Sequence, residues 1–305
     1  MSLNDKTNDK VTLGISLIIG FTVFGPIMDS FAKLASNSIP IGEIVFSRFF
    51  VQALFLFPLV IIFKLSYLPN FKECILHFIR ASLIISATSL FFGAIKFMPI
   101  ADALAIFLVN PFLMILLSRL ILKEKINKNK ILACIFGFFG ALLIIKPSYS
   151  LFGIVCLFPL GTAFSYSIYM ILTRHMTKEI HPIPMQFLTG FAAVIIMFVL
   201  LYIFHDKNFT PLNSVWPDFI NLMLLIGVGI TATISHIFVV YGLRLIPAST
   251  AAPILYFEIV VAAILGFFIF NDLPDLLALS GIIVIIAAGL YISIYENFIS
   301  KEPTH

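Results

Sequence analysis

Long apolar stretches alternate with short polar connections along the whole chain. A helix needs about 20 mostly apolar residues to cross the hydrocarbon of a bilayer. Scanning the sequence with that length gives ten segments: Val11–Ala35, Ile41–Phe63, Ile75–Phe97, Ile100–Leu122, Ile131–Lys146, Gly153–Leu172, Ile183–Phe204, Phe219–Leu243, Pro247–Phe270 and Leu276–Ile294. The longest hydrophilic connections, Lys123–Lys130 and His205–Asp218, are too short for a soluble domain. The pattern predicts an all-α polytopic membrane protein with ten transmembrane helices.

The composition supports this prediction and excludes other classes of protein. Hydrophobic residues make up 61% and charged residues 11%, whereas globular domains have about 45–50% and about 25%. The net charge of +4 comes from basic residues in connections, which excludes a nucleic-acid footprint. Three cysteines, Cys74, Cys134 and Cys156, lie in or beside apolar segments without metal-ligand spacing. We therefore expect no disulfide scaffold, metal or cofactor.

The distribution of lysine and arginine predicts the orientation of the chain. With the N-terminus inside, the cytoplasmic side receives Lys6, Lys10, Lys64, Lys72, Lys123, Lys125, Lys128, Lys130, Arg174, Lys178, Arg244 and Lys301, and the outer side receives Lys33, Lys96, Lys146 and Lys207. This bias follows the positive-inside rule. It predicts an inner-membrane protein with both termini in the cytoplasm. The first segment is too long for a signal peptide and has no small-residue cleavage site, so we expect it to stay as a helix.

The second half of the sequence weakly repeats the first. Shifting Ala94–Ile144 by 148 residues places it on Gly242–Ile292 without a gap, and Pro99 then meets Pro247. Each half, 1–147 and 148–305, holds five predicted spans. Because five is odd, the second half must enter the membrane from the opposite side. Inverted repeats of this kind typify secondary transporters, whose solute binds near the midplane between the repeats.

Polar residues deep inside the spans are the candidate binding residues, since an ionisable group there costs at least about 2.5–3.5 kcal/mol. Glu258 lies near the middle of the ninth span, and its partner in the repeat is Asn110 in the fourth. We expect both at the same depth, where a carrier would bind its solute. The alternative is a hydrogen bond or ion pair that holds the bundle together.

Four further residues join this candidate site. His236 lies inside the eighth span and can relay a proton, bond a solute, or stay neutral and structural. Arg48 lies about two turns into the second span. Tyr166 and Tyr256 carry hydroxyls that need partners at membrane depth, and Tyr256 is close to Glu258 in sequence.

Three other charged residues fit a structural role better. Asp29 and Lys33 are one helical turn apart and can pair on one face, and Glu43 follows in the next span. We predict a cluster of structural ion pairs near the outer end of the first half. In the first span, Gly25 and Pro26 indicate either a hinge or a kink that faces a ligand.

Several motifs together resemble the EamA branch of the drug/metabolite transporter superfamily. They are Met28-Asp29-x-x-Ala32-Lys33, Arg48-Phe49, Pro99-x-Ala101-Asp102-Ala103-x-Ala105-Ile106, Pro111, Glu124, Gly137-x-x-Gly140-Ala141, Ala248-Ser249-Thr250-Ala251-Ala252-Pro253, Tyr256-x-Glu258 and Phe270-Asn271-Asp272-x-Pro274-Asp275. The resemblance covers nearly the whole chain. One departure is Ile259, where many members have a proline.

The resemblance implies a ten-span carrier of a small organic metabolite. The second half is similar to S-adenosylmethionine uptake carriers of intracellular bacteria, and the first half also resembles riboflavin carriers. Amino acids are a further possibility, and export is the alternative to uptake. Two remote alternatives are a channel, which would need a polar stripe along a pore, and an intramembrane enzyme, which would need a reactive set of residues. The sequence has no His-Glu-x-x-His or Gly-x-Ser-x-Gly motif.

Overall fold

The computed structural model is a bundle of helices. It describes residues 3–65, 68–124, 126–144, 153–205, 207, 209–270 and 276–299. These residues are 86% helical, and no strand occurs among them. Seven helical segments are long and apolar enough to cross a membrane, and Asn110–Ile121 is a shorter apolar helix. The expectation of an all-helical membrane protein is therefore confirmed, while the count of ten spans stays a prediction.

In the first half, each predicted segment overlaps one helix or two consecutive helices. They are α1 (Leu3–Ala35), α2 (Ile41–Ile62), α3 (Phe71–Phe97), α4 (Ile100–Phe107), α5 (Asn110–Ile121) and α6 (Lys128–Ile144). Helix α3 begins earlier than predicted because Asn70 and Glu73 form a capping box at its N-terminus. Helix α1 runs through Gly25 and Pro26 without a break, so the two residues do not divide the first span.

In the second half, the same correspondence holds. The elements are η1 (Gly153–Cys156), α8 (Leu157–Met176), α9 (Pro182–Phe204), η2 (Thr210–Leu212), α10 (Phe219–Leu245), α11 (Ala248–Ala251), η3 (Ala252–Tyr256), α12 (Phe257–Phe270) and α13 (Leu276–Ile299). The boundary between the predicted halves at 147/148, and the predicted acidic turn at Asp272 and Asp275, lie outside the described residues.

Two predicted spans are not uniform α-helices. Ile100–Leu122 is interrupted at Leu108–Val109 between α4 and α5, and Pro247–Phe270 stays helical but changes from α11 through the 3-10 segment η3 to α12. A proline follows closely after the start of the new segment in each case, Pro111 in α5 and Pro253 in η3. Proline has no N–H to bond the carbonyl of the preceding turn. The departure from α-helix therefore comes before Glu258, not after it at Ile259, where the family's proline is missing.

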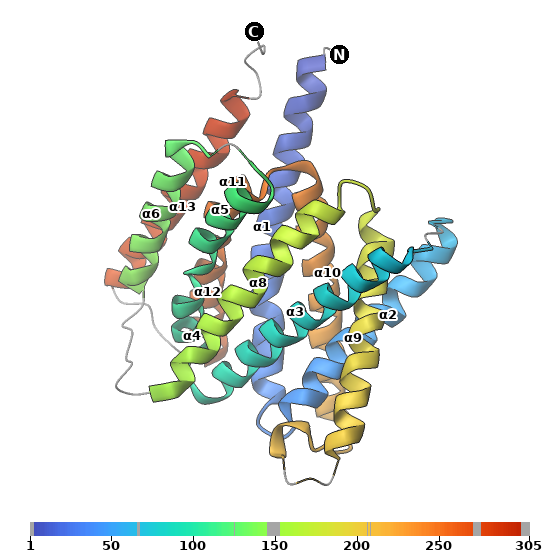
Figure 1. Ribbon diagram of the computed structural model, residues 1–305. Helices are drawn as coiled ribbons and strands as arrows, with labels where there is room; N and C mark the ends of the chain where they lie inside the picture. Colours follow the sequence, from blue (N-terminus) through green and yellow to red (C-terminus); the bar gives the residue numbers. More distant parts are fainter. Residues whose placement is uncertain are drawn as a thin grey trace.

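The helices pack in pairs that join the two halves of the chain. Helix α1 packs along α10 and α3 along α8, while α2 pairs with α9 and α6 with α13. Figure 1 shows α6 and α13 at one edge of the bundle and α2 and α9 at the other. Large apolar side chains such as Phe57, Ile62 and Phe198 are exposed on the outside, as expected for a surface that faces lipid.

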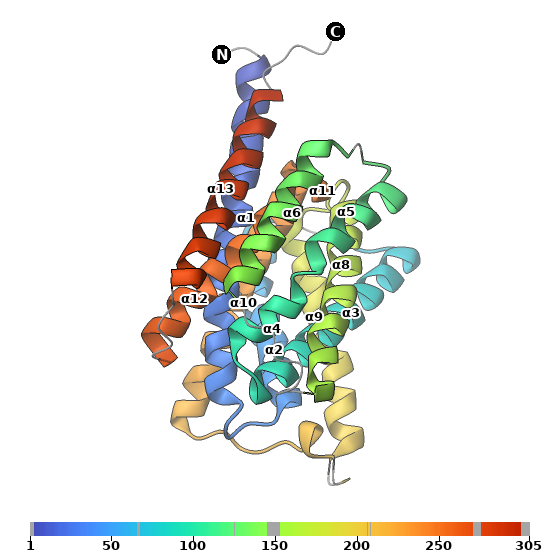
Figure 2. The ribbon, with the colours of Figure 1, turned by 90° about the vertical axis from the view of Figure 1, so that its left-hand side faces the viewer.

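The first residue of α1 and the last residue of α13 lie at the same end of the bundle (Figures 1 and 2). The connections from α5 to α6, from α8 to α9 and from α10 to α11 are at this end as well (Figure 1). The connection between α1 and α2 and the segment η2 are at the opposite end. We call the first end the terminal end and the second the distal end.

Candidate functional site

A buried cavity lies between the two halves of the chain. Helices α1, α2, α3 and α4 line it from the first half, and α8, α10 and α12 from the second. Its volume is about 60 Å³. Aromatic and aliphatic side chains form most of the wall, and a few polar groups point into it, as in ligand-binding pockets generally.

Two carboxylates line this cavity. Glu258 is in the first turn of α12, directly after the 3-10 segment η3, and Asp29 is in the last two turns of α1. They are 8% and 2% exposed. The Oδ1 atom of Asp29 has no hydrogen-bond partner among the described residues. Burying a carboxylate oxygen without a partner is costly, so this atom is positioned for a group that the protein itself does not supply.

Gly25 allows the Glu258 side chain to lie against α1. A Cβ atom at position 25 would be 2.6 Å from Oε1 of Glu258. That is too close for any non-bonded contact, so an alanine there would push the carboxylate aside. Gly25 is itself part of the cavity wall. Gly25 therefore faces the candidate site, although α1 continues through Pro26 as a single helix.

Arg48 supplies the positive charge of the cavity. It is 1% exposed, donates hydrogen bonds to Thr88 and His236, and its guanidinium stacks 4.7 Å from the ring centroid of Phe49. Arg48 and Asp29 line the same cavity. The Nε of Arg48 has no hydrogen-bond partner in the described part of the chain.

The hydrogen bonds of His236 determine which of its nitrogens carries the proton. Arg48 can only donate, so the Nε2 of His236, at 2.5 Å from the guanidinium, must accept. The Nδ1 atom then donates to the hydroxyl of Tyr169 at 3.2 Å. His236 is thus neutral here, with both nitrogens engaged by the protein. This geometry suits a residue that orients Arg48 better than one that relays a proton.

A second buried arginine continues this network away from the cavity. Arg80 of α3 donates to Tyr169 at 2.9 Å, to Gln186 at 2.5 Å and to Thr189 at 2.5 Å. Arg80 is not among the predicted binding residues, although an arginine inside an apolar span is itself a mark of a functional or structural polar site. Its partners lie on α8 and α9, more than eighty residues away in sequence, so only the fold brings them together.

Tyr166 completes the polar side of the wall. Its ring stacks on that of Tyr169 at 5.6 Å and lies 6.4 Å from that of Phe21, measured between centroids. Its hydroxyl is buried without a hydrogen-bond partner in the described ranges. Four of the six predicted binding residues, Glu258, Arg48, His236 and Tyr166, therefore lie around one cavity.

The other two predicted binding residues are buried outside the lining of the cavity. Asn110, at the start of α5, donates to Ser167 Oγ at 2.8 Å and to the Ala163 carbonyl at 3.3 Å. Tyr256 donates to the Leu108 carbonyl at 3.4 Å, which is one of the groups released by the break between α4 and α5. Both contacts fit the structural alternative, in which polar groups hold neighbouring helices together.

The three residues expected in a structural cluster take different positions. Asp29 lines the cavity with Arg48, as described above. Lys33 donates to the Met98 carbonyl at 2.9 Å, and Glu43 accepts from the backbone N–H of Val215 at 2.9 Å. A structural ion pair within this set stays a prediction, and the position of Asp29 favours a role in the cavity.

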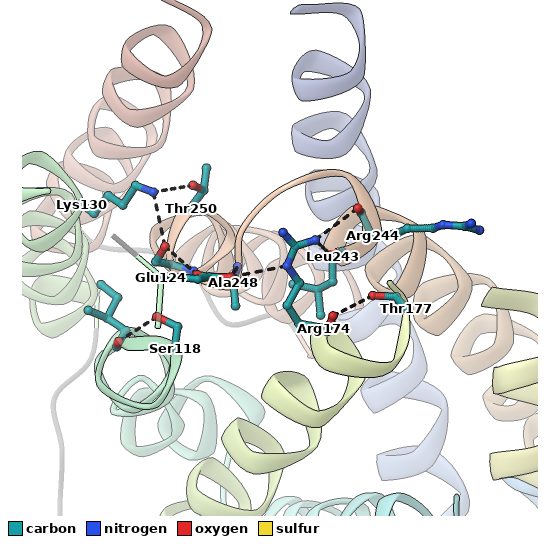
Figure 3. A network of polar contacts seen from close by, with 11 residues as sticks. Ser118, Glu124, Lys130, Arg174, Thr177, Leu243, Arg244, Ala248 and Thr250 are labelled. Carbon is teal, nitrogen blue, oxygen red and sulfur yellow. Dashed lines mark hydrogen bonds and ion pairs between the residues drawn. The ribbon is translucent and has the colours of Figure 1, made fainter. Parts of the chain in front are cut away.

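A separate polar network joins the halves at the terminal end (Figure 3). Glu124, in the connection between α5 and α6, forms an ion pair with Nε of Arg174 at 3.5 Å. It also accepts hydrogen bonds from the backbone N–H groups of Ala248 at 3.2 Å and Ser249 at 3.1 Å. Lys130 of α6 donates to Thr250 at 2.9 Å. We call Glu124, Lys130 and Arg174 the terminal clasp.

Comparison with known proteins agrees with this geometry. The profile of the EamA-like transporter family matches residues 12–146 and again residues 152–294. The chain belongs to the EamA-like transporter family. The two successive matches together cover nearly all of the sequence, and the division into two halves at 147/148 stays a prediction.

Named members of the family are distant relatives of this chain. An S-adenosylmethionine uptake transporter of Rickettsia prowazekii is 25% identical over 96% of both chains. A riboflavin transporter of Brucella anthropi is 24% identical over 74% of this chain and 78% of its own. A solved crystal structure, 17% identical, superposes on 92% of this chain and 97% of its own with a TM-score of 0.73, which shows a shared fold.

No group of three or more histidine, cysteine, aspartate or glutamate side chains in the described ranges is arranged to hold a metal ion. The polar groups of the cavity are two carboxylates, one guanidinium, one phenol, the imidazole of His236 and the hydroxyls of Thr88, Thr162 and Ser235. Such a set can bind a charged organic solute through ion pairs and hydrogen bonds.

Proposed function

We propose that this protein is a secondary transporter that moves a small organic metabolite across the cytoplasmic membrane by alternating access. The observation that carries the proposal is the buried cavity between the halves, in which Asp29, Arg48, Tyr166 and Glu258 present charged or unpaired polar atoms. Charged residues at membrane depth are rare and mark solute or ion pathways.

The packing of the helices supports an inverted repeat of ten spans, 1–147 and 148–305. The first segment of the first half, α1, packs on the third segment of the second half, α10. Conversely, the third segment of the first half, α3, packs on α8, the first segment of the second half. A two-fold axis in the membrane plane would produce this exchange, and it would let one half rock against the other.

We infer S-adenosylmethionine as the first solute to test, with uptake as the direction. The relative in Rickettsia prowazekii carries that name, and buried carboxylates suit a solute with a cationic centre. Riboflavin, an amino acid, or export by the same scaffold is the alternative, since a riboflavin transporter is also among the relatives.

The decisive experiment is counterflow in liposomes. Purified protein is reconstituted in vesicles loaded with unlabelled S-adenosylmethionine, riboflavin or an amino-acid mixture, and the entry of the same labelled solute is followed. We expect exchange of one of them in the wild type and a loss of at least about tenfold in Glu258→Gln, since ion-pair hydrogen bonds contribute about 1.5–3 kcal/mol. Glu43→Gln is the matched control, because Glu43 is outside the cavity lining. Equal exchange in both variants would remove Glu258 from the site.

A further inference from the structure

The charges of the cavity specify the charges of its solute. Two carboxylates, Asp29 and Glu258, and one guanidinium, Arg48, line the same buried space. His236 is held neutral by its hydrogen bonds. Asp29 and Arg48 line the same space and can balance one another, whereas the described residues of the lining include no second guanidinium or ammonium for Glu258. In a solute-bound state with both acids ionised, the site has one negative charge more than Arg48 balances.

Buried charges need partners, and a solute has to supply those that the protein does not. Oδ1 of Asp29 and Nε of Arg48 are both buried without hydrogen-bond partners among the described residues. One is an acceptor and the other a donor. A solute that satisfies both must offer a donor and an acceptor at once, and a cationic donor with an anionic acceptor makes the strongest such pair of hydrogen bonds.

We propose that the solute carries two positive charges and one negative charge. Its cationic centres pair with Asp29 and Glu258, and its carboxylate with Arg48. This inference rests on the proposed transport function and narrows it to a chemical class. S-adenosylmethionine has this pattern, with a sulfonium, an ammonium and a carboxylate, and so does lysine. Methionine and S-adenosylhomocysteine lack one of the positive charges, and riboflavin has none of the three.

Competition against labelled S-adenosylmethionine in proteoliposomes tests the charge pattern. We expect S-adenosylhomocysteine and decarboxylated S-adenosylmethionine to compete at least about tenfold more weakly than the full compound, because each leaves one buried charge unpaired. In Asp29→Asn the penalty for S-adenosylhomocysteine shrinks, while the penalty for the decarboxylated analogue stays. Arg48→Lys keeps the charge and loses the planar donor set, and it weakens the compounds that carry a carboxylate.

Three results would overturn the charge inference and leave the carrier standing. One is equal competition by S-adenosylhomocysteine, which would mean that Asp29 and Glu258 share a proton. Another is exchange of riboflavin with no exchange of S-adenosylmethionine or lysine. The third is an Asp29→Asn profile identical to that of the Glu43→Gln control. Absence of exchange for every solute would contradict the transport function itself.

A second inference rests on the terminal clasp alone. Glu124 and Lys130 belong to the first half, whereas Ala248, Thr250 and Arg174 belong to the second. Figure 3 shows the side chains of Glu124 and Arg174 pointing toward one another across the joint. Arg174 is also held by the carbonyls of Leu243 and Arg244 at the end of α10. Three helix ends of the second half are thus tied to one connection of the first.

The clasp is directly connected to the candidate site. The backbone groups that Glu124 accepts from are the first two of α11, and this segment leads through η3 to Glu258 in the first turn of α12. Separating the halves at the terminal end would require Glu124 to release Arg174 and α11. The side chains of Arg174 and Glu124 are only 16% and 13% exposed, so the released groups would gain water.

We infer that the clasp closes the terminal end of the cavity and breaks when the cavity opens toward that side. Glu124→Gln removes the charge and keeps one acceptor, so the closed form loses stability while the bundle stays folded. The population that is open at the terminal end should rise. Glu73→Gln is the matched control, because the Glu73 side chain accepts a hydrogen bond from the backbone of Asn70 at the start of its own helix, α3, in the first half.

The test uses a cysteine at Ser235, which lines the cavity, in a chain whose three native cysteines are replaced. Membrane vesicles of known orientation are treated with an impermeant thiol reagent on the side of the termini. We expect labelling in Glu124→Gln to be several-fold faster than in the parent and in Glu73→Gln, with an unchanged elution profile in size exclusion. An unchanged labelling rate in well-folded Glu124→Gln would contradict the inference that the clasp closes the terminal end. Faster labelling from the opposite side of the membrane would mean that loss of the clasp opens the cavity at the distal end instead.

Discussion

Gly25 and Glu258 illustrate how a site in this protein depends on two segments that are far apart in sequence. Glu258 is an acid in an apolar span, and the sequence alone indicated it as a binding residue. Its environment, however, includes the bare backbone of α1 at Gly25, where a Cβ atom would be 2.6 Å from Oε1. Close approach of this kind is a property of the fold.

We predict that Gly25→Ala impairs transport with little loss of stability. The added methyl group displaces the Glu258 carboxylate, and uptake should fall by about tenfold or more, as for loss of a charged hydrogen bond. Uptake in proteoliposomes and the melting temperature are the measurements. Gly93→Ala is the control, since its Cβ would meet only Phe158 at 3.3 Å. Partial recovery in Gly25→Ala with Glu258→Asp would show that the lost function comes from crowding.

Asp29 and Arg80 show where prediction from single residues ends. For Asp29, the sequence offered Lys33 one turn away, so a local ion pair was the natural interpretation. Only the packing of α1, α2 and α12 brings Asp29 and Arg48 to the same cavity. Arg80 was passed over because its partners, Tyr169, Gln186 and Thr189, lie on other helices. Ionisable type and depth can be read from sequence, whereas the partner cannot.

Among the helices, hydropathy predicted the segments well and their interruptions poorly. Apolar residues continue through Leu108–Val109 and through Ala252–Tyr256, so a hydropathy window sees one unbroken span. Pro111 and Pro253 are the residues that disfavour a continuous helix, by removing a backbone donor. The released carbonyl of Leu108 accepts from Tyr256, so the 3-10 segment of one half stabilises the break in the other.

We predict that Pro253→Ala slows transport without unfolding the protein. An alanine restores the N–H that can bond the carbonyl of Ser249, and an interior proline disfavours a helix by about 3 kcal/mol. The straightened segment would shift Glu258, so uptake should drop several-fold while the melting temperature stays equal or rises. Pro58→Ala is the matched control, because Pro58 is an exposed proline inside the continuous helix α2. The same uptake in both variants would contradict a functional break.

The bundle taken as a whole has its two helical termini at one end. Helices α1 and α13 begin and end there (Figures 1 and 2), as an even number of spans requires. The connections at that end include those from α5 to α6 and from α8 to α9, which contain Lys123 and Lys178. The fold thus brings these lysines and both helical termini to one end, and the side of the membrane that this end faces stays a prediction from the charge bias.

We predict that both termini face the cytoplasm. Short epitope tags at either end should resist protease added to intact spheroplasts and be cleaved after permeabilisation. A tag in the segment between α9 and α10, which is at the distal end, should be cleaved in intact spheroplasts. Cleavage of one terminal tag alone would contradict an even number of spans.

The narrow interior has a consequence for turnover. The cavity volume of about 60 Å³ is well below the about 300–1,000 Å³ of ordinary ligand pockets, so the helices must move apart before a metabolite can occupy the middle. A larger solute would require a larger movement of the two halves and would expose more of the apolar side chains that line the cavity. Among solutes of equal charge, the one with the smallest cross-section should therefore be transported fastest. A solute too large for the helices to close around it would bind without being transported and act as an inhibitor.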